Sequence, residues 1–197
     1  SVLSNLVTDV TVAEWDKKTK RFVAEAQRKI GSLILARKSL TAVPVEAKRE
    51  ALVLHLKKEG LSLLPWTTDL HQWCARVLLV RSVEPNHDWP DVSQETLTAN
   101  LAAWLGPYLD GVKLLQDFKK LDLKQILQSL LPYELQQRLN HLAPERFTVP
   151  SGSSISINYR ESSPILAVKL QEMFGCESSP TVVNGKVPLT IHLLSPA

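Results

Sequence analysis

The stretch "TVPSGSSISINYR", residues 148–160, is compatible with two different structures. Its serine- and glycine-rich centre could cradle a phosphate, because consecutive backbone N–H groups aimed at one point hold phosphate oxygens. Such a loop needs a strand before it and a helix N-terminus after it. The residues that follow the loop instead alternate between apolar and polar: Ile155, Ile157 and Tyr159, with Ser154, Ser156 and Asn158 between them. This two-residue period is typical of a half-buried strand, so we predict a tight turn between strands.

Working outward from this turn, we predict a ββαββ unit over residues 146–197. "RFTV", residues 146–149, offers the first strand a partner. Ser163 and Pro164 then open an expected helix that ends at Gly175, and Leu166, Leu170 and Met173 share one of its faces. The last segment, residues 181–194, reads as a hairpin, because Asn184-Gly185 suits a type I′ turn.

Residues 43–145 carry the period of helices and predict a helical bundle. Four segments show it: 46–60, 67–83, 90–107 and 121–144. In the second, apolar residues recur at helical spacing after Thr67 or Thr68 as N-cap. In the third, Asp91 and Ser93 compete as cap. The fourth holds two helices in series, separated at Pro132.

Residues 1–42 predict a meander of about three strands. "VTVAEWD" (10–16) and "RFVAEAQ" (21–27) are joined by a polar turn, and Gly31 separates them from "SLILARKSL" (32–40). A sheet this small is marginal alone, so it either belongs to a larger β domain or packs on the helices that follow. The chain as a whole is therefore predicted to be α+β.

The composition of the 197 residues is that of an ordinary globular protein, with 44% hydrophobic and 22% charged residues. No apolar run approaches the roughly 18 residues of a membrane span. The first residues lack the pattern of a signal peptide, and the chain does not start with Met, so we expect a portion of a longer protein. The two cysteines, Cys74 and Cys176, have no framework spacing, which favours reduced thiols and a cytoplasmic location.

The net charge of +3 is unevenly distributed. Residues 1–60 hold 12 Lys and Arg against 7 Asp and Glu, whereas residues 61–131 hold 6 against 8 and residues 132–197 hold 5 against 5. A local basic excess is what a phosphate backbone requires, although solvated surface lysines give the same pattern. The candidate nucleic-acid contacts are Trp15, Lys17, Lys18, Lys20, Arg21, Arg28 and Lys29. Arg28 and Lys29 are adjacent in a strand, so only one of them can join a given patch.

No set of residues predicts catalysis or metal binding within the chain. The nearest text to a phosphate-binding P-loop, "NGKVP", lacks its first glycine and its hydroxyl. His71 and Cys74 could supply half of a zinc site, but no second half follows at suitable spacing. Cys74, Trp73 and Trp104 lie in apolar helix stripes and are predicted to be core. We therefore predict no catalytic residue, no metal site and no cofactor in this chain.

An ordered set of phrases resembles the C-terminal part of the HrpB family, bacterial ATP-dependent helicases of the DEAH type. They run along essentially the whole chain: "EWDKKTKRFVAEAQRKIGSLIL", "GLSLLPWT", "CARVLLVRS", "WPDVSQETL", "WLGPYLDGV", "LLPYELQQRLNHLAPERFTVPSGSSISINY", "PILAVKLQEMFG" and "VPLTIHLLSPA". The resemblance implies two upstream motor domains that bind ATP and magnesium, followed by helical accessory domains and an oligonucleotide-binding (OB-like) β-barrel. Residues 1–42 would then be the terminal strands of that barrel, and residues 43–145 and 146–197 the family-specific region.

Two functions follow from these observations. The first is an accessory region of an ATP-dependent RNA helicase, which helps to hold single-stranded nucleic acid, RNA in particular, while the motor domains hydrolyse ATP. The alternative is a module that docks another protein or braces the upstream helicase domains. By itself the chain is predicted to be inactive, so its partners rather than a substrate define its role.

Overall fold

The computed structural model describes residues 2–196 and shows a mixed α+β chain that forms two compact units. The first unit comprises Ser1–Pro65 and Leu97–Ile126, and the second comprises Trp66–Thr96 and Leu127–Ala197. Ser1 and Ala197, the outermost residues of the predicted domains 1–42 and 146–197, lie outside the described residues. The three-domain division stays a prediction.

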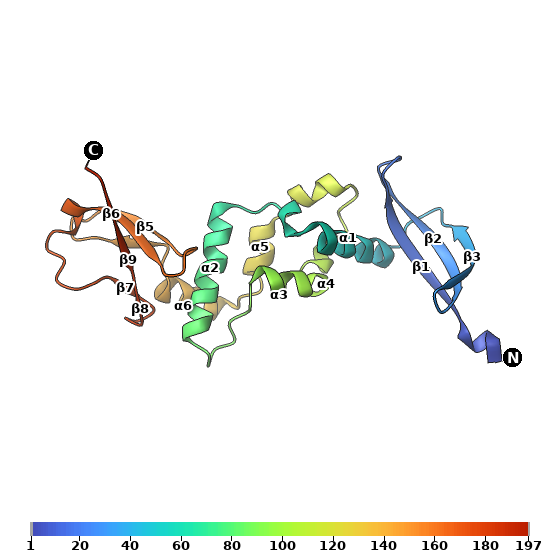
Figure 1. Ribbon diagram of the computed structural model, residues 1–197, viewed down its shortest axis with the longest axis horizontal. Helices are drawn as coiled ribbons and strands as arrows, with labels where there is room; N and C mark the ends of the chain where they lie inside the picture. The colour runs from blue at the N-terminus through green and yellow to red at the C-terminus, as the bar shows by residue number, and fades with distance from the viewer. Residues whose placement is uncertain (1, 197) are drawn as a thin grey trace. The chain divides into compact units, whose positions relative to one another are not determined.

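The first unit begins with a three-stranded antiparallel sheet, as the sequence predicted. After a 3-10 turn, η1 (Val2–Leu6), come β1 (Val7–Asp16), β2 (Arg21–Ile30) and β3 (Leu33–Ser39), in that spatial order (Figure 1). The β1–β2 register places Trp15 opposite Phe22 and Asp16 opposite Arg21. A bulge shifts the β2–β3 register between Arg28 and Lys29. Within the described residues none of the sheets closes into a barrel.

The helices of the first unit lie in two stretches of sequence. The elements are α1 (Val45–Glu59), η2 (Leu61–Leu63), α4 (Leu101–Trp104), η3 (Gly106–Tyr108) and η4 (Leu115–Lys120). Two more helices, α3 (Gln94–Ala99) and α5 (Leu123–Gln128), contain residues of both units. The Nε and Nη2 of Arg49 on α1 donate hydrogen bonds to the carboxylate of Asp110. The Nζ of Lys48 donates to the carbonyl oxygen of Asp110 at 2.9 Å. These contacts fix α1 against the segment that follows η3.

The prediction of a single helix over residues 90–107 is wrong, because the helix is interrupted at Asn100. Asn100 has φ −108° and ψ 21°, outside helical geometry, and separates α3 from α4. The Trp104 indole N–H donates to the carbonyl oxygen of Leu97 at 2.8 Å. In a continuous helix that carbonyl would accept from the N–H of Leu101. The buried indole N–H of Trp104 therefore satisfies the carbonyl oxygen of Leu97, which has lost its helical donor at this interruption.

In the second unit, α2 (Thr68–Val83) and α6 (Tyr133–Leu142) pack together. Thr67 is the N-cap of α2, since its hydroxyl accepts from the N–H of Leu70 at 3.2 Å. Ser93 rather than Asp91 caps α3, because its hydroxyl accepts from the N–H of Thr96. Trp73 and Cys74 are buried in this unit, as predicted.

The C-terminal sheet corrects the predicted ββαββ order. Its four strands are β4 (Arg146–Thr148), β5 (Ser154–Asn158), β6 (Ile165–Lys169) and β9 (Thr190–Leu194), in the order β4-β5-β6-β9. The serine- and glycine-rich loop is the turn between the antiparallel β4 and β5, so the turn prediction is confirmed. The helix expected over residues 163–175 is wrong: β6 and a 3-10 turn, η5 (Leu170–Met173), occupy that segment.

The physical reason for this error is a short segment whose pattern fits both periods. Leu166 and Val168 are buried while Ala167 between them is exposed, which is the alternation of a strand. β6 pairs with β5 on one side and lies parallel to β9 on the other, so two strands satisfy its backbone. The expected hairpin exists as β7 (Thr181–Val182) and β8 (Val187–Pro188), with Asn184 and Gly185 at φ +52° and +80°. After it the chain leaves the hairpin to form β9.

Candidate nucleic-acid interface

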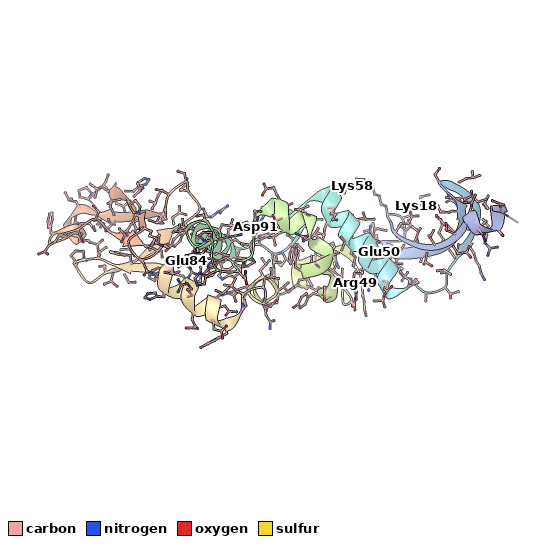
Figure 2. All side chains as sticks on the ribbon, turned by 90° about the horizontal axis from the view of Figure 1, so that it is seen from below. Lys18, Arg49, Glu50, Lys58, Glu84 and Asp91 are labelled. Atoms are coloured by element: carbon pink, nitrogen blue, oxygen red, sulfur yellow. The ribbon has the colours of Figure 1, made fainter. Side chains whose placement is uncertain are left out.

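The turn between β1 and β2 gathers four of the seven predicted contact residues. Lys17, Lys18 and Lys20 lie in the turn, and Arg21 begins β2 (Figure 2 labels Lys18). All four side chains are exposed, and none of them makes an ion pair with any residue from 2 to 196. Cations that lack an internal partner remain available to an external anion.

Asp16 organises this turn. Its carboxylate accepts the N–H of Lys18 at 2.8 Å and the hydroxyl of Thr19 at 2.9 Å, and its carbonyl oxygen accepts the N–H of Lys20 at 2.8 Å. The hydrogen bond from the Lys18 N–H, followed by that from the Thr19 hydroxyl, lowers the pKa of Asp16. The carboxylate therefore stays ionised at neutral pH inside a basic turn.

An aromatic pair lies directly below the turn. The rings of Trp15 and Phe22 meet edge to face, with centroids 5.1 Å apart and planes at 66°. Both side chains are half-buried, so part of each ring surface is accessible. An accessible aromatic face beside cations is the combination on which single-stranded nucleic acids stack.

The two remaining candidates point to opposite faces of the sheet. Arg28 is on the same face as Trp15, and its guanidinium makes a bidentate pair with Asp9, at 2.9 and 3.2 Å. The hydrogen bond with Asp9 raises the pKa of Arg28 and holds that charge in place. Lys29 lies on the other face. The structure therefore brings Arg28 to the aromatic face already paired, and separates Lys29 from it.

One cation on the face of Trp15 was not predicted from the sequence. Lys38 on β3 pairs with Ala26, which shares its face with Phe22 and Arg28, and its side chain is exposed. The bulge makes the β2–β3 register irregular, so counting along β3 does not predict the face that Lys38 occupies.

The net charge differs more between the two compact units than between the segments of the sequence. The first unit carries 16 Lys and Arg against 10 Asp and Glu, and the second carries 7 against 10. The segment 97–126 adds four lysines to the basic unit, although it lies far from the first strands in sequence. The second unit is mildly acidic. Basic character is thus a property of the unit that holds the hairpin.

Two grooves complete the surface. One, of about 430 Å³, lies over the sheet and is lined by Val12, Glu14, Val23, Ala24, Glu25, Gln27, Arg37, Ser39 and Leu40. The other, of about 420 Å³, lies in the second unit between α2 and the residues after β5, and Leu78, Val92 and Arg160 are among its lining. Neither was predicted, because each needs the register or the packing of distant segments.

His71 and Cys74 both line the second groove. Burial raises the pKa of the Cys74 thiol to about 12, and burial followed by the charge of Arg160 lowers the pKa of His71. The His71 ring stacks on Trp66, with centroids 4.8 Å apart. Among residues 2–196, no cluster of three or more His, Cys, Asp or Glu could hold a metal ion. Over the same residues, no helix has both the length and the apolar character that a bilayer crossing requires.

Comparisons with known proteins agree with this architecture. A family model described as "ATP-dependent helicase C-terminal" matches residues 104–197, and one described as the connector region of the ATP-dependent RNA helicase HrpB matches residues 6–40. The chain is 39% identical over 193 residues to the ATP-dependent RNA helicase HrpB of Escherichia coli (strain K12), an alignment that covers 98% of this chain and 24% of the relative.

Two crystal structures of the Escherichia coli protein are similar along nearly the whole chain. The one titled as a DExH-box NTPase superposes with a TM-score of 0.79 at 38% identity and covers 98% of this chain and 24% of that one. The one titled as a DEAH/RHA helicase gives a TM-score of 0.76 at 36% identity and covers 97% and 25%. The chain spans about a quarter of the length of these relatives. It belongs to the HrpB family of ATP-dependent helicases and corresponds to the C-terminal region of that family.

Proposed function

We propose that the tip of the β1–β2 hairpin binds single-stranded nucleic acid, RNA in particular, as an accessory surface of an ATP-dependent RNA helicase. The supporting observation is the set of four exposed cations, Lys17, Lys18, Lys20 and Arg21, which lack ion-pair partners among the described residues. Their neighbours Trp15 and Phe22 offer partly accessible rings. Phosphates would contact the cations, and a base would stack on Trp15.

The contributions of the seven candidates differ. Arg28 is already paired with Asp9, so an approaching phosphate must compete with an existing bidentate contact. Lys29 lies on the face away from Trp15, as Arg21 does, but it pairs with Thr8 at the end of the strands opposite the turn. It therefore contributes at most long-range attraction, which salt screens. The hairpin tip therefore carries most of the proposed affinity.

Residues 1–42, which contain the sheet, are proposed to be the terminal strands of an oligonucleotide-binding β-barrel. Val10, Val12 and Val23 lie on the face away from Trp15 and expose 38%, 38% and 40% of their surfaces. Aliphatic side chains on one face of a three-stranded sheet favour coverage by further strands. In this proposal the helical and C-terminal regions, 43–145 and 146–197, support the barrel. ATP and magnesium would be bound by motor domains elsewhere in the helicase.

The test reverses the charge of Lys17, Lys18, Lys20 and Arg21 together and measures anisotropy of a fluorescein-labelled oligouridylate across a salt series. Each lost phosphate contact should reduce the slope of log affinity against log salt by about 0.7. A matched control reverses Lys57, Lys58, Lys113 and Lys124, which lie outside the hairpin in the same unit and are exposed. An equal effect of both quadruple variants, or none from either, would contradict a hairpin site.

A second candidate function, bracing or protein docking, is favoured by the groove in the second unit. Its floor is apolar at Ala75, Leu78 and Val92, and Arg160 and Glu161 flank it. An apolar floor with charged margins is typical of protein contact surfaces. Replacing Leu78 by Glu would block docking there while leaving oligonucleotide binding unchanged, so helicase assays with this variant separate the two functions.

A further inference from the structure

We infer that Asp16 is a positioning residue for phosphate binding by the basic turn. This inference rests on the proposed function and names a residue that acts through Lys17, Lys18 and Lys20 rather than by contact with the nucleic acid. A carboxylate in the middle of a phosphate site repels the ligand. Simple electrostatics therefore predicts that removing Asp16 strengthens binding, and the inference predicts the opposite.

The hydrogen bonds of Asp16 reach each of the three residues that follow Lys17. The carboxylate binds the N–H of Lys18 and the hydroxyl of Thr19, while the carbonyl oxygen binds the N–H of Lys20. One residue therefore sets the backbone that carries the lysines on both sides of Thr19. Without it the turn would be free to spread its cations over many arrangements, and binding would have to order them.

The conformation of Lys20 supports a functional origin for this turn. Lys20 has φ +53°, a left-handed conformation that glycine or asparagine adopts at lower cost. Strained residues of this kind persist where the surrounding contacts determine them, and they concentrate at functional sites. Here the contact is the hydrogen bond from the Lys20 N–H to Asp16. The turn thus keeps a cation where a smaller neutral residue would be more stable.

Three single variants separate position from charge. Asp16→Ala removes the negative charge and both side-chain hydrogen bonds. Asp16→Asn removes the charge but can still accept from the Lys18 N–H and donate to the Thr19 hydroxyl. Glu14→Gln removes one negative charge from the same strand, at an exposed residue that takes no part in the turn. The first variant alone loses the turn geometry.

The experiment measures binding of the same labelled oligouridylate to the full chain at several salt concentrations, with the thermal midpoint of each variant recorded. We expect Asp16→Ala to lose one phosphate contact, which lowers its salt slope by about 0.7. Between 1 M and 0.1 M salt, the affinity of this variant should therefore rise about fivefold less than that of the wild type. Asp16→Asn and Glu14→Gln should bind as tightly as the wild type or more tightly. A fall in salt slope for Asp16→Ala at temperatures well below its midpoint distinguishes lost positioning from unfolding.

The outcomes separate this inference from the proposed function. If the wild type does not bind, or if reversing the four cations changes nothing, the proposed function fails and the inference fails with it. If the reversal abolishes binding but Asp16→Ala binds as tightly as Asp16→Asn, the hairpin is the site and Asp16 does not position it. Weaker binding by Asp16→Ala together with rescue by Asp16→Asn supports the inference.

Discussion

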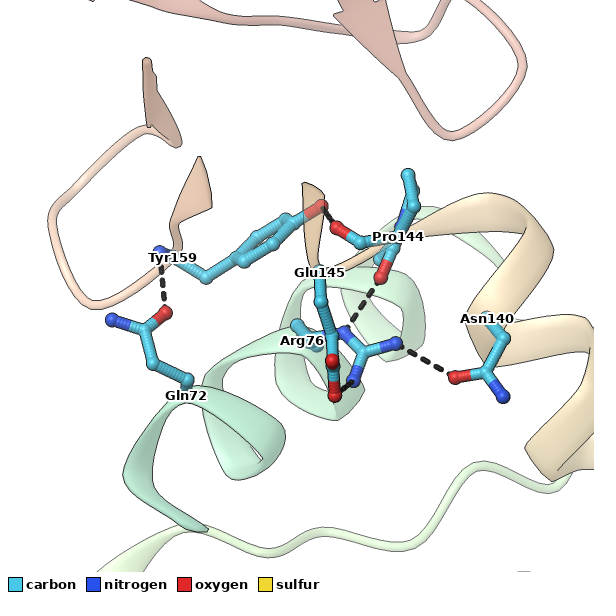
Figure 3. A network of polar contacts seen from close by, with 7 residues as sticks. Gln72, Arg76, Asn140, Pro144, Glu145 and Tyr159 are labelled. Atoms are coloured by element: carbon cyan, nitrogen blue, oxygen red, sulfur yellow. Dashed lines mark hydrogen bonds and ion pairs between the residues drawn. The ribbon is translucent and has the colours of Figure 1, made fainter. Parts of the chain in front are cut away.

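The Nε of Arg76 lies 2.6 Å from the carbonyl oxygen of Ala143, and this contact joins α2 to the end of α6 (Figure 3). The Arg76 side chain is 3% exposed, and its guanidinium also donates to Asn140 at 2.9 Å and pairs with Glu145 at 3.3 Å. Burial of the cation lowers the pKa of Arg76, while Glu145 opposes this shift. The second unit is therefore held by a buried charge whose donors face acceptors from α6 and from the segment between α6 and β4.

Replacing Arg76 by Ala should destabilise the second unit by about 2–4 kcal/mol, because the buried carbonyl oxygen of Ala143 loses its donor and a cavity replaces the side chain. Glu145→Gln should cost less than about 1 kcal/mol, since Glu145 is 78% exposed and its ion pair is largely solvated. Chemical denaturation monitored by tryptophan fluorescence measures both. Similar losses for the two variants would mean that the ion pair, not the buried hydrogen bonds, stabilises this region.

Tyr159 belongs to the same network and should make the stability depend on alkaline pH. Its hydroxyl donates to the carbonyl oxygen of Pro144 at 2.6 Å, and Gln72 accepts the N–H of Tyr159 at 2.8 Å (Figure 3). Burial raises the pKa of Tyr159 above its ordinary value of 10.0, against the smaller opposing effect of Arg76. A raised folded-state pKa stabilises below the unfolded pKa, and this stability is lost as pH rises toward the folded one.

We therefore expect the free energy of unfolding to fall above about pH 10, by up to about 1.4 kcal/mol per pH unit for this group. Tyr159→Phe should be less stable than the wild type at pH 8, and its alkaline decline should be shallower. Denaturation curves from pH 8 to 11 measure this difference. Cys74 contributes a similar decline from about pH 9, since burial raises its thiol pKa to about 12, so Cys74→Ala serves as the background for both proteins.

At acid pH, Glu84 should have the opposite effect. Both Nε and Nη2 of Arg138 on α6 contact its carboxylate, which follows α2 and is 9% exposed. The hydrogen bond from Arg138 lowers the pKa of Glu84, so its stabilising contribution is present above the unfolded pKa and is lost as pH falls through the folded one. Glu84→Gln should flatten the decline of the thermal midpoint below about pH 4.5. If Glu84→Gln did not change the fall of the thermal midpoint at acid pH, other carboxylates would be responsible for that fall.

The elements that follow from local pattern were predictable, and those that depend on distant partners were not. The alternation after the loop at residues 150–153 predicted β5, and an N-cap at Thr67 or Thr68 predicted the start of α2, because each signal is complete within a few residues. The segment 165–169 carries both periods, and only pairing with β5 and β9 decides that it is a strand.

The candidate site shows the same division. Lys17, Lys18, Lys20 and Arg21 are neighbours in sequence, so their clustering at one turn could be predicted. The pair between Arg28 and Asp9 joins residues 19 positions apart and exists only in one strand register. The hydrogen bonds of Asp16 were also not predicted, since they depend on the backbone conformation that the turn adopts.

Lys20→Gly should increase stability and decrease nucleic-acid binding at once. Glycine adopts a φ of +53° without the steric cost of a Cβ, so the variant should gain about 1 kcal/mol in the free energy of unfolding. It also loses one of the cations of the turn, so its salt slope should fall by about 0.7. Thr19→Gly, which removes a hydroxyl donor to Asp16 but no charge, is the matched control and should not gain stability. If Lys20→Gly bound oligouridylate as tightly as the wild type, Lys20 would have no contact with phosphate, and its left-handed conformation would need a structural explanation.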